Sequence, residues 1–480
     1  MTTITVVGVP GHRRVRLFRD AAVAAGLPEP AVVSWRDVCA GAFTLGASGD
    51  AVGGALGDVS GGVHGGAFED ASGGVFVGGA VGEGGAVSGH WVRLESPGED
   101  AEIDRLLRGA AAPAAHGEIV GLAAWHRGLV AAARRVEARG VPLLTAVDEL
   151  DVMFDKRRCH ALLHSRGVAV PEAFTAGGYE EIRDRGRQQG WRRVFVKPPH
   201  GSSASGVVAL AFGGDRRRIS AYTSAVLDGG RLFNELRVRH YTDERIIAAI
   251  IDRLAAEGRP AAEGPPATAG PPATAGPAAT AGLVAASGRA AAEGVAAAEG
   301  PAAAEGPAAG EGVGAHVAGG LHVERWLSKA SHDGLVLDLR VLVVAGRVSH
   351  VVVRTGRSPM TNLHLGNARG DLAGVRAAAG EEHWAAAMRT CEAAAACFPR
   401  SLHVGVDLMF GRDYGTHAVA EVNAFGDLLP GLLVGGRDTY AAEIDALLSG
   451  RFTPAGVTVS AGVPGPAGGD VASRALAGVR

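Results

Sequence analysis

The chain has 480 residues, and its 47 Lys and Arg against 50 Asp and Glu give a formal net charge of −3. This balance argues against non-specific binding to nucleic acid or to an anionic membrane, which needs a strongly basic field. Gly and Pro, with 73 and 23 residues, make up one residue in five, whereas ordinary proteins contain about 12% of the two together. We therefore expect roughly two to four folded domains, interrupted by sequence that does not fold.

The four cysteines, Cys39, Cys159, Cys391 and Cys397, are scattered and show neither the paired spacing of a zinc site nor a disulfide framework. At the N-terminus the basic residues follow the apolar stretch, which is the reverse of a secretory signal. The sequence also lacks an uninterrupted apolar run of about 18 residues. We therefore expect a cytoplasmic protein without a membrane segment.

The first third of the chain alternates short β-branched apolar runs with stretches of helical spacing. The expected strands span 3–9, 31–35 and 142–146, and the expected helices span 13–26 and 129–140. This alternation predicts a small Rossmann-like α/β domain over residues 1–150. Its polar loops at 7–14 and 95–100 are expected on the substrate side, because open α/β sheets bind ligands at strand ends.

Three segments have too many small residues to form a core. They span about 46–90, about 256–315, where EGPPATAG-like near-repeats occur, and 454–480. We expect disordered insertions and a flexible tail. A recognition arm of polyproline character is the alternative for the second segment.

The remaining sequence predicts an α+β body in which antiparallel strands alternate with helices. The expected helices span 155–167, 179–190 and 381–398; the expected strands lie at 168–174, at both ends of 191–210, at 321–327, in a hairpin over 338–354, and at 403–411 and 417–425.

The stretch VFVKPPHGSSASGVV joins two of these strands through a Gly/Ser loop. Lys197, at the end of the first strand, supplies one fixed cation, and the loop supplies exposed backbone N–H groups. This combination is typical of a polyphosphate site, although a plain structural turn is the alternative. It is not a Walker loop, because the Lys precedes the glycines.

Oxygen donors gather on the last pair of strands. Asp407 lies in VGVDLMF, and Glu421 and Asn423 in VAEVN are two residues apart and share a strand face. Hard oxygen ligands of this kind suit Mg²⁺, which usually shares its site with phosphates. The alternative is a solvated sheet edge.

The hairpin over 338–354 carries charged residues towards one end of a sheet. Asp338 and Arg340 share a strand face, and Arg354 ends the return strand. Arginine grips phosphate or carboxylate oxygens in a fixed bidentate geometry. Each of these residues taken alone could equally be an ordinary charged residue on the surface.

The order of these motifs over residues 150–450 resembles the ATP-grasp superfamily, particularly ligases of the glutathione synthetase and ribosomal-protein glutamate ligase type. The resemblance implies a pre-ATP-grasp domain over 1–150, a small ATP-grasp lobe over 151–235 and a large lobe over 236–453. It implies ATP and Mg²⁺, for which Mn²⁺ can substitute, as cofactors. Residues implied to bind the nucleotide are Lys156, Lys197, His200, Gly201, Ser202, Ser203, Ser205, Gly206, Glu324, Arg325, Trp326, Leu327, Lys329 and Asn362.

The same resemblance implies that Arg340 and Arg354, with Lys197, face the phosphoryl group and the acyl substrate, and that Asp407, Glu421 and Asn423 hold the metal. The interdomain hinge departs from the pattern, because it reads HVERWLSKA and places Lys329 where relatives have an acid for the ribose. Met360 also replaces a frequent Arg. These departures bear on the acyl substrate and on the ribose contact.

The expected activity is an ATP-dependent ligase that joins a small-molecule or peptide carboxylate to an amine, or to a thiol, through an acyl phosphate. Such chemistry needs positioning and charge neutralisation more than a protein nucleophile. His364, beside Asn362, is a candidate general base. Two alternatives remain open: a small-molecule kinase on the same scaffold, and a non-catalytic ATP-binding regulator.

Overall fold

The computed structural model describes residues 2–46, 89–98, 100–201, 205–213, 218–258, 320–426 and 429–454. The three glycine-rich segments fall almost entirely outside these ranges, as do Ser202 and Ser203. Within the described ranges, no helix is both long enough and apolar enough to cross a bilayer.

The first sheet has three parallel strands in the order β2-β1-β3: β1 is Thr2–Gly8, β2 is Ala31–Ser34 and β3 is Gly89–Leu94. The helices of this region are α1 (Arg13–Ala24), α2 (Trp35–Ala40), α3 (Ala101–Arg108) and α4 (Leu122–Glu137). Strand β2 ends earlier than expected because the Ser34 hydroxyl accepts a hydrogen bond from the Arg36 N–H and caps α2. The strand expected at 142–146 is reduced to two isolated bridges, at Leu143 and Thr145.

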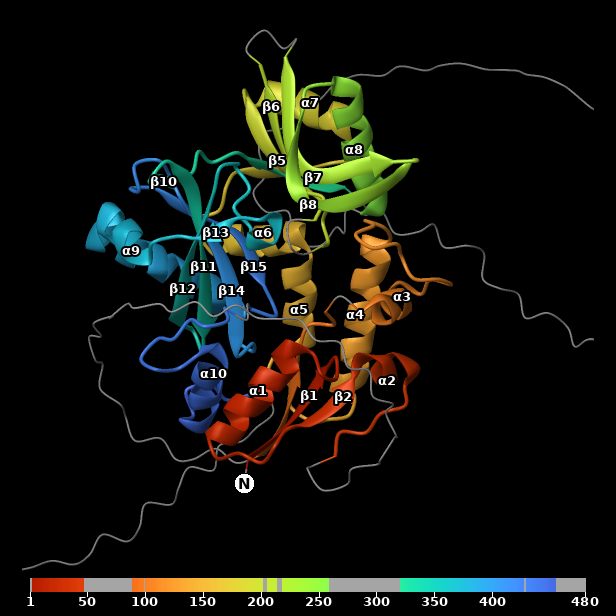
Figure 1. Ribbon diagram of the computed structural model, residues 1–480, viewed down its shortest axis with the longest axis vertical. Helices are drawn as coiled ribbons and strands as arrows, with labels where there is room; N and C mark the ends of the chain where they lie inside the picture. The colour runs from red at the N-terminus through yellow and green to blue at the C-terminus, as the bar shows by residue number, and fades with distance from the viewer. Residues whose placement is uncertain are drawn as a thin grey trace, which may run out of the picture. The chain divides into compact units, whose positions relative to one another are not determined.

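The second sheet is antiparallel, in the order β4-β9-β5-β6-β7-β8 (Figure 1). Its strands are β4 (Ala173–Ala176), β5 (Arg193–Lys197), β6 (Val208–Phe212), β7 (Ile219–Asp228), β8 (Arg231–Tyr241) and β9 (Leu321–Arg325). Helices α7 (Tyr179–Gln188) and α8 (Glu244–Glu257) pack on each other, and α8 packs on β7 and β8. The sequence had predicted none of β7, β8 and α8, and the strand expected from 168 begins only at Ala173.

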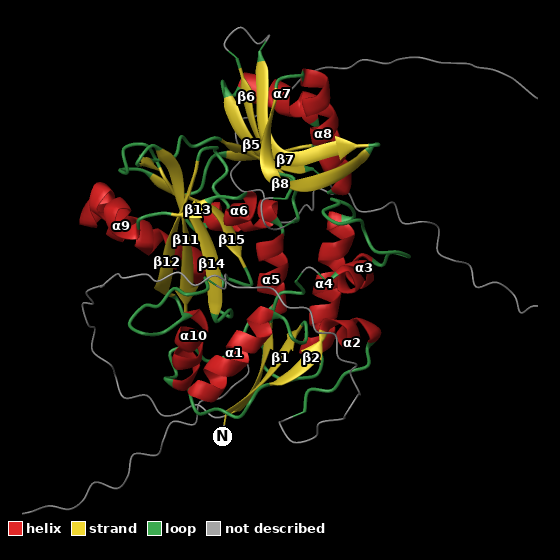
Figure 2. Cartoon of the chain, viewed as in Figure 1, coloured by secondary structure: helices red, strands yellow, loops and turns green. Residues whose placement is uncertain are grey.

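The third sheet runs β13-β12-β11-β14-β15, with β10 paired to β11 (Figure 2). Its strands are β10 (Ser331–His332), β11 (Leu335–Val344), β12 (Arg347–Gly356), β13 (Ala368–Arg369), β14 (His403–Phe410) and β15 (His417–Asn423). The accompanying helices are α5 (Val147–Phe154), α6 (Lys156–Ser165), the 3-10 turn η1 (Leu363–Leu365), α9 (Leu372–Ala396) and α10 (Thr439–Leu448). Helix α9 breaks at Gly380, where φ is 74°, so the helix expected from 381 is its second part.

One apolar core is shared by the first and third sheets. Ile4 and Trp91, from the first sheet, belong to the same buried cluster as Leu342 on β11 and Ile444 on α10. Helix α1 packs on α10. Burial of apolar surface therefore ties the first sheet to the last third of the chain.

A buried arginine crosses the same junction. Arg93 on β3 is 1% exposed, and its guanidinium carbon lies 4.5 Å from the Phe18 ring centre and 5.0 Å from that of Tyr440. Its Nε is 3.0 Å from Glu95 Oε2, and its Nη1 donates to Glu443 on α10. Burial would lower the pKa of the Arg93 guanidinium, but the carboxylates of Glu443 and Glu95 outweigh this effect and raise the pKa.

Candidate active site

Strand register brings the predicted charged residues together. In the second sheet, Lys197 on β5 lies opposite His322 on β9. In the third sheet, Arg340 on β11 lies opposite Asp407 on β14, and Asp407 lies opposite Glu421 on β15. Residues far apart in the sequence thus meet because their strands are neighbours.

Lys197, Asp407 and Glu421 line one cavity of about 90 Å³ that receives side chains from both sheets. Three lysines and an arginine meet three acids of the third sheet there. The charged lining residues are Lys156, Lys197, Lys329, Arg354, Glu324, Asp338, Asp407 and Glu421, and Asn362, Gly201 and Ser205 also line the cavity. The four cations are thus matched by four carboxylates, so the lining has a formal charge of zero and suits a polyanion that binds together with a metal cation.

Lys197 and Glu324 form a buried ion pair at one wall of the cavity. The Lys197 Nζ donates to Glu324 Oε1 at 2.7 Å and to the Ala420 carbonyl at 3.1 Å. The His322 ring lies 3.0 Å from the same carboxylate oxygen. Burial alone would raise the pKa of Glu324, but Lys197 and His322 outweigh it and lower the pKa to about 2. Glu324 therefore stays ionised and holds the ammonium group in the cavity.

Lys156, the first residue of α6, connects the Gly/Ser loop between β5 and β6 to β15. Its Nζ donates to the Gly201 carbonyl at 2.6 Å and lies 3.0 Å from Glu421 Oε1. Burial would raise the pKa of Glu421, but Lys156 first and Lys197 second lower it. Lys156 therefore contacts both the loop expected to cover phosphates and an acid expected to hold metal.

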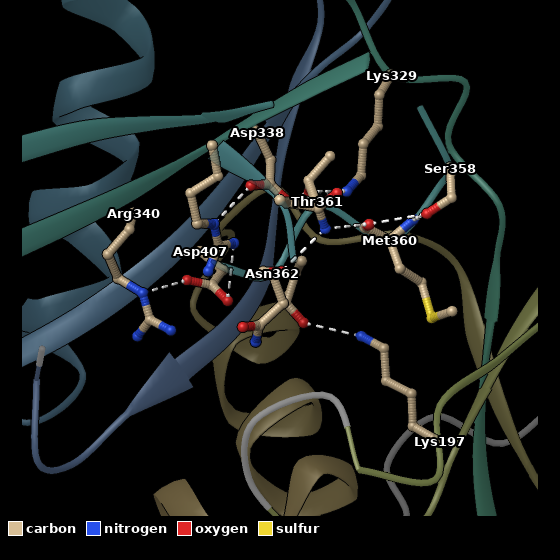
Figure 3. Close-up of polar contacts among 12 residues, drawn as sticks. Lys197, Lys329, Asp338, Arg340, Ser358, Met360, Thr361, Asn362 and Asp407 are labelled. Atoms are coloured by element: carbon tan, nitrogen blue, oxygen red, sulfur yellow. Dashed lines mark hydrogen bonds and ion pairs between the residues drawn. The ribbon is translucent and has the colours of Figure 1, made fainter. Parts of the chain in front are cut away.

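Asp338 organises the opposite wall (Figure 3). Its Oδ2 accepts from the Lys329 Nζ at 2.7 Å and from the Thr361 hydroxyl, and its Oδ1 accepts from the Arg354 Nε at 2.7 Å. Burial would raise the pKa of Asp338, but the charges of Arg354 and Lys329 outweigh this effect and hold the pKa well below its usual range. Lys329, which was expected to bind the nucleotide, is thus paired with Asp338.

Two arginines contact Asp407. Arg340 Nε lies 2.8 Å from Asp407 Oδ1, and Arg354 Nη2 lies 3.2 Å from Oδ2 (Figure 3). The pKa of Asp407 is nevertheless raised, chiefly because the carboxyl group is buried. Arg340 and Arg354 lower this pKa, whereas the negative charges of Glu421 and Asp338 raise it further. An additional cation beside Asp407 would therefore be electrostatically favourable.

The donor set of β14 and β15 fits a hard divalent cation. Asp407 and Glu421 face each other across the two strands, and Asn423 follows on β15. The Asn423 side-chain nitrogen is buried and has no hydrogen-bond partner among the described residues. Because an amide can be turned to present its oxygen instead, this position can offer a third oxygen ligand.

The described part of the Gly/Ser loop between β5 and β6 is closely packed. Gly206 has φ 72°, and a Cβ atom there would lie 2.6 Å from Leu254, so only glycine fits. Gly201 and Ser205 reach the cavity, whereas His200 is buried against the His126 ring at 4.2 Å between centres. Burial first and His126 second lower the pKa of His200 to about 4. His200 therefore acts as a neutral packing residue at the base of the loop.

The three hinge residues after Glu324 do not line the cavity. Arg325 is exposed, and its Nη1 lies 2.6 Å from Glu172. The Trp326 ring packs behind Phe195, with centres 4.9 Å apart, and Phe195 itself lines the cavity. Leu327 is absent from the lining as well. Trp326 therefore contacts the cavity wall rather than its interior.

A neighbouring pocket of about 130 Å³ joins this site to the first α/β region. Arg14 and Ser96, from the two polar loops expected on the substrate side, line it. Arg340 and His364 line it from the third sheet and η1. It also shares Asn362, Glu421 and Gly201 with the cavity. A molecule in this pocket would thus lie beside the residues of the candidate metal centre.

Sequence reasoning missed Thr361, which lines the cavity, and the apolar residues Phe195, Val207 and Met409 beside it. Thr361 follows Met360 in a loop whose composition does not indicate a binding site. The apolar residues follow from strand alternation, because Phe195 and Lys197 on β5 point to the same side.

No family model matches the sequence, and no curated protein matches it. The structure is similar to that of D-cycloserine synthetase DcsG, with 13% identity, TM-score 0.46 and coverage of 94% of this chain and 99% of the other. It is similar to the ATP-grasp ligase PsnB bound to a minimal precursor, with 15% identity, TM-score 0.43 and coverage of 93% and 99%. It is also similar to the D-alanine–D-alanine ligase from Bacillus anthracis complexed with ATP, with 10% identity, TM-score 0.43 and coverage of 94% and 98%. Each of these three identities is below 25%, and each TM-score is below 0.5.

Proposed function

We propose that the chain is an ATP-dependent ligase that joins a carboxylate to an amine, or to a thiol, through an acyl phosphate. The observation that carries the proposal is the single cavity in which Lys156, Lys197 and Arg354 surround the facing acids Asp407 and Glu421. Cations on one side and hard oxygen donors on the other are what a metal-bound polyphosphate requires.

The proposed reaction has two steps. The γ-phosphoryl group of ATP passes to a substrate carboxylate oxygen, and ADP leaves. The amine then attacks the acyl carbon, releases phosphate and loses a proton. Lys197 and Lys156 neutralise phosphate oxygens, and Arg340 and Arg354 stabilise charge near the acyl group. Ion pairs to Glu324 and Glu421 hold both ammonium groups in the cavity before substrate binds.

Asp407, Glu421 and Asn423 would hold Mg²⁺, or Mn²⁺ in its place, and the ion would supply charge neutralisation at the phosphates. The neighbouring pocket with Arg14 and Arg340 is proposed as the place of the carboxylate substrate. Its volume of about 130 Å³ suits a small molecule or one residue of a peptide.

The domain organisation is proposed on the same basis: a pre-ATP-grasp domain over 1–150, a small lobe over 151–235 and a large lobe over 236–453. The parallel sheet of β1 to β3 supports the first of these domains. The boundary at 235 falls inside β8, and β9 also belongs to the second sheet, so the division between the two lobes does not follow a sheet boundary.

The proposal is tested by measuring ADP release with Mg-ATP and pools of amino acids, hydroxy acids and short peptides. Hydroxylamine added to the reaction should trap an acyl hydroxamate, which a kinase would not produce. Arg340→Lys should lower turnover, whereas Arg389→Lys, at an exposed position on α9, is the matched control. Tight Mg-ATP binding without ADP release in any pool would favour the regulator, and phosphorylated product without hydroxamate would favour the kinase.

A further inference from the structure

A larger cavity lies between helix α7 and the ends of β5, β6 and β7. Its volume is about 330 Å³, compared with about 90 and 130 Å³ for the two pockets of the candidate active site. It shares no lining residue with either of them. We call it the arginine pocket, after Arg183, Arg187, Arg192 and Arg218, which line it.

Two of these arginines already have carboxylate partners. Arg183 Nη2 lies 2.5 Å from Glu180 Oε2, and its Nη1 lies 3.3 Å from Glu244 Oε1. Arg187 Nη1 lies 3.1 Å from Asp184 Oδ1. These pairs fix two guanidinium groups along α7 and leave little positive charge there.

The other two arginines are different. Arg192 and Arg218 are exposed, and no ion pair joins either guanidinium group to another residue of the described ranges. Their backbones are held, because the Arg192 carbonyl accepts from the Phe212 N–H at 2.8 Å and the Arg218 carbonyl accepts from the Gly213 N–H at 2.6 Å. The pocket therefore presents two guanidinium groups that have no ion-pair partner within the described ranges, and such groups bind carboxylate or phosphate oxygens in a bidentate geometry.

The remaining lining contains the Glu244 carboxylate, which is paired with Arg183, and several large apolar or aromatic side chains. Trp191, Phe212 and Ile219 are half-buried, and Tyr179 is 2% exposed. The Trp191 ring is held against the Phe174 ring, with centres 5.4 Å apart. Partly exposed rings beside unpaired cations favour a ligand with a planar apolar part as well as an anionic part.

We propose that the arginine pocket binds a small organic anion in which a flat ring carries a carboxylate or phosphate group. The ring lies on Trp191 and Phe212, and the anionic group is bound by Arg192 and Arg218. The volume of about 330 Å³ falls at the small end of ligand sites, which span about 300 to 1,000 Å³. Binding here is independent of the proposed ligase activity, since the two sites share no residue.

Calorimetric titration of the full chain tests the proposal with guanosine monophosphate and indole-3-acetate as ring-bearing anions. Inorganic phosphate and acetate represent the anion alone, and guanosine and indole represent the ring alone. At least one ring-bearing anion should bind more tightly than both of its parts. Arg192→Glu combined with Arg218→Glu should weaken that binding about tenfold or more, as loss of charged hydrogen bonds does.

The matched control is Arg237→Glu combined with Arg389→Glu, which changes the net charge equally at two exposed arginines outside the pocket. It should leave binding unchanged, and thermal unfolding should show that both double variants fold. Lack of binding by both ring-bearing anions at about 1 mM would overturn the proposal. So would equal binding of the anion alone, or binding lost in Lys197→Met but kept in the pocket variant, which would place the probe in the active-site cavity.

Discussion

Replacing Lys197 by methionine keeps most of the side-chain volume and removes the positive charge, so Glu324 remains buried with only His322 beside it. The wild-type environment lowers the pKa of Glu324 from its ordinary value of 4.5 to about 2. At about 1.4 kcal/mol for each factor of ten, that difference corresponds to about 3 kcal/mol. Because His322 stays in place at 3.0 Å, we expect Lys197→Met to lower the free energy of unfolding by about 2 to 3 kcal/mol at pH 7.

The pH dependence has a definite sign. A carboxyl group with a lowered pKa stabilises the folded state above its unfolded pKa, and that contribution is lost as the pH falls through the folded pKa. The stability gap between wild type and Lys197→Met should therefore be full at pH 7 and narrow below about pH 4.5. Urea unfolding at several pH values measures it.

A double variant separates stability from catalysis. Lys197→Met with Glu324→Gln removes both charges, and should recover most of the lost stability because no unpaired buried charge remains. It should not recover ADP release, since a phosphate-neutralising group is still absent; the expected loss in kcat is on the order of 10²-fold. Wild-type stability and wild-type turnover in Lys197→Met would refute this account of the cavity.

Three further predictions concern other parts of the molecule. Glu421→Gln should keep the fold but raise the Mg²⁺ concentration needed for ATP turnover, and an unchanged Mg²⁺ titration would place the metal elsewhere. Gly128→Ala should lower the free energy of unfolding by about 1 to 3 kcal/mol or more, because its Cβ would lie 1.8 Å from the Leu107 carbonyl oxygen; equal urea midpoints would contradict the close contact of α3 and α4. The pKa of the buried His200 is about 4, whereas an unfolded histidine takes up a proton near pH 6.5. The free energy of unfolding should therefore decrease as the pH falls from about 6.5 towards 4. His200→Gln should flatten that part of the stability curve, and an unchanged slope would assign it to other groups.

The parts of the fold that the sequence predicted well are those with strong local signals. The β-branched runs of β1, β11, β12 and β14 and the regular apolar spacing of α1 and α6 appear in the structure close to the expected positions. Strand β2 was extended one residue too far, because the Ser34 cap of α2 was not recognised. Strand β8 was missed because its polar residues hide the alternation; Arg231, Arg237, Arg239 and His240 are exposed at the edge of the sheet.

In the candidate site, too, residues with a local sequence signal were predicted and contacts that depend on strand pairing were not. Lys197, Arg340 and Asp407 were predicted because their residue types and strand positions carry a signal by themselves. The ion pair of Lys197 with Glu324, which are 127 residues apart, depends on the pairing of β5 with β9. Single-sequence reasoning cannot determine which of several strands pair across a long intervening segment, so this contact was not foreseen.

The buried Arg93 has a consequence for dissecting the protein. A fragment that began after residue 150 would lack Arg93 and Phe18, and would leave Glu443 on α10 without its cation and the Tyr440 ring open to water. A fragment containing only the first 150 residues would keep Glu95 beside Arg93 but lose Glu443 and the Tyr440 ring. The two pieces should therefore be insoluble when expressed separately and should complement each other when co-expressed. The first 150 residues therefore cannot be exchanged independently of the rest of the chain, although the order of the sequence suggests separable domains.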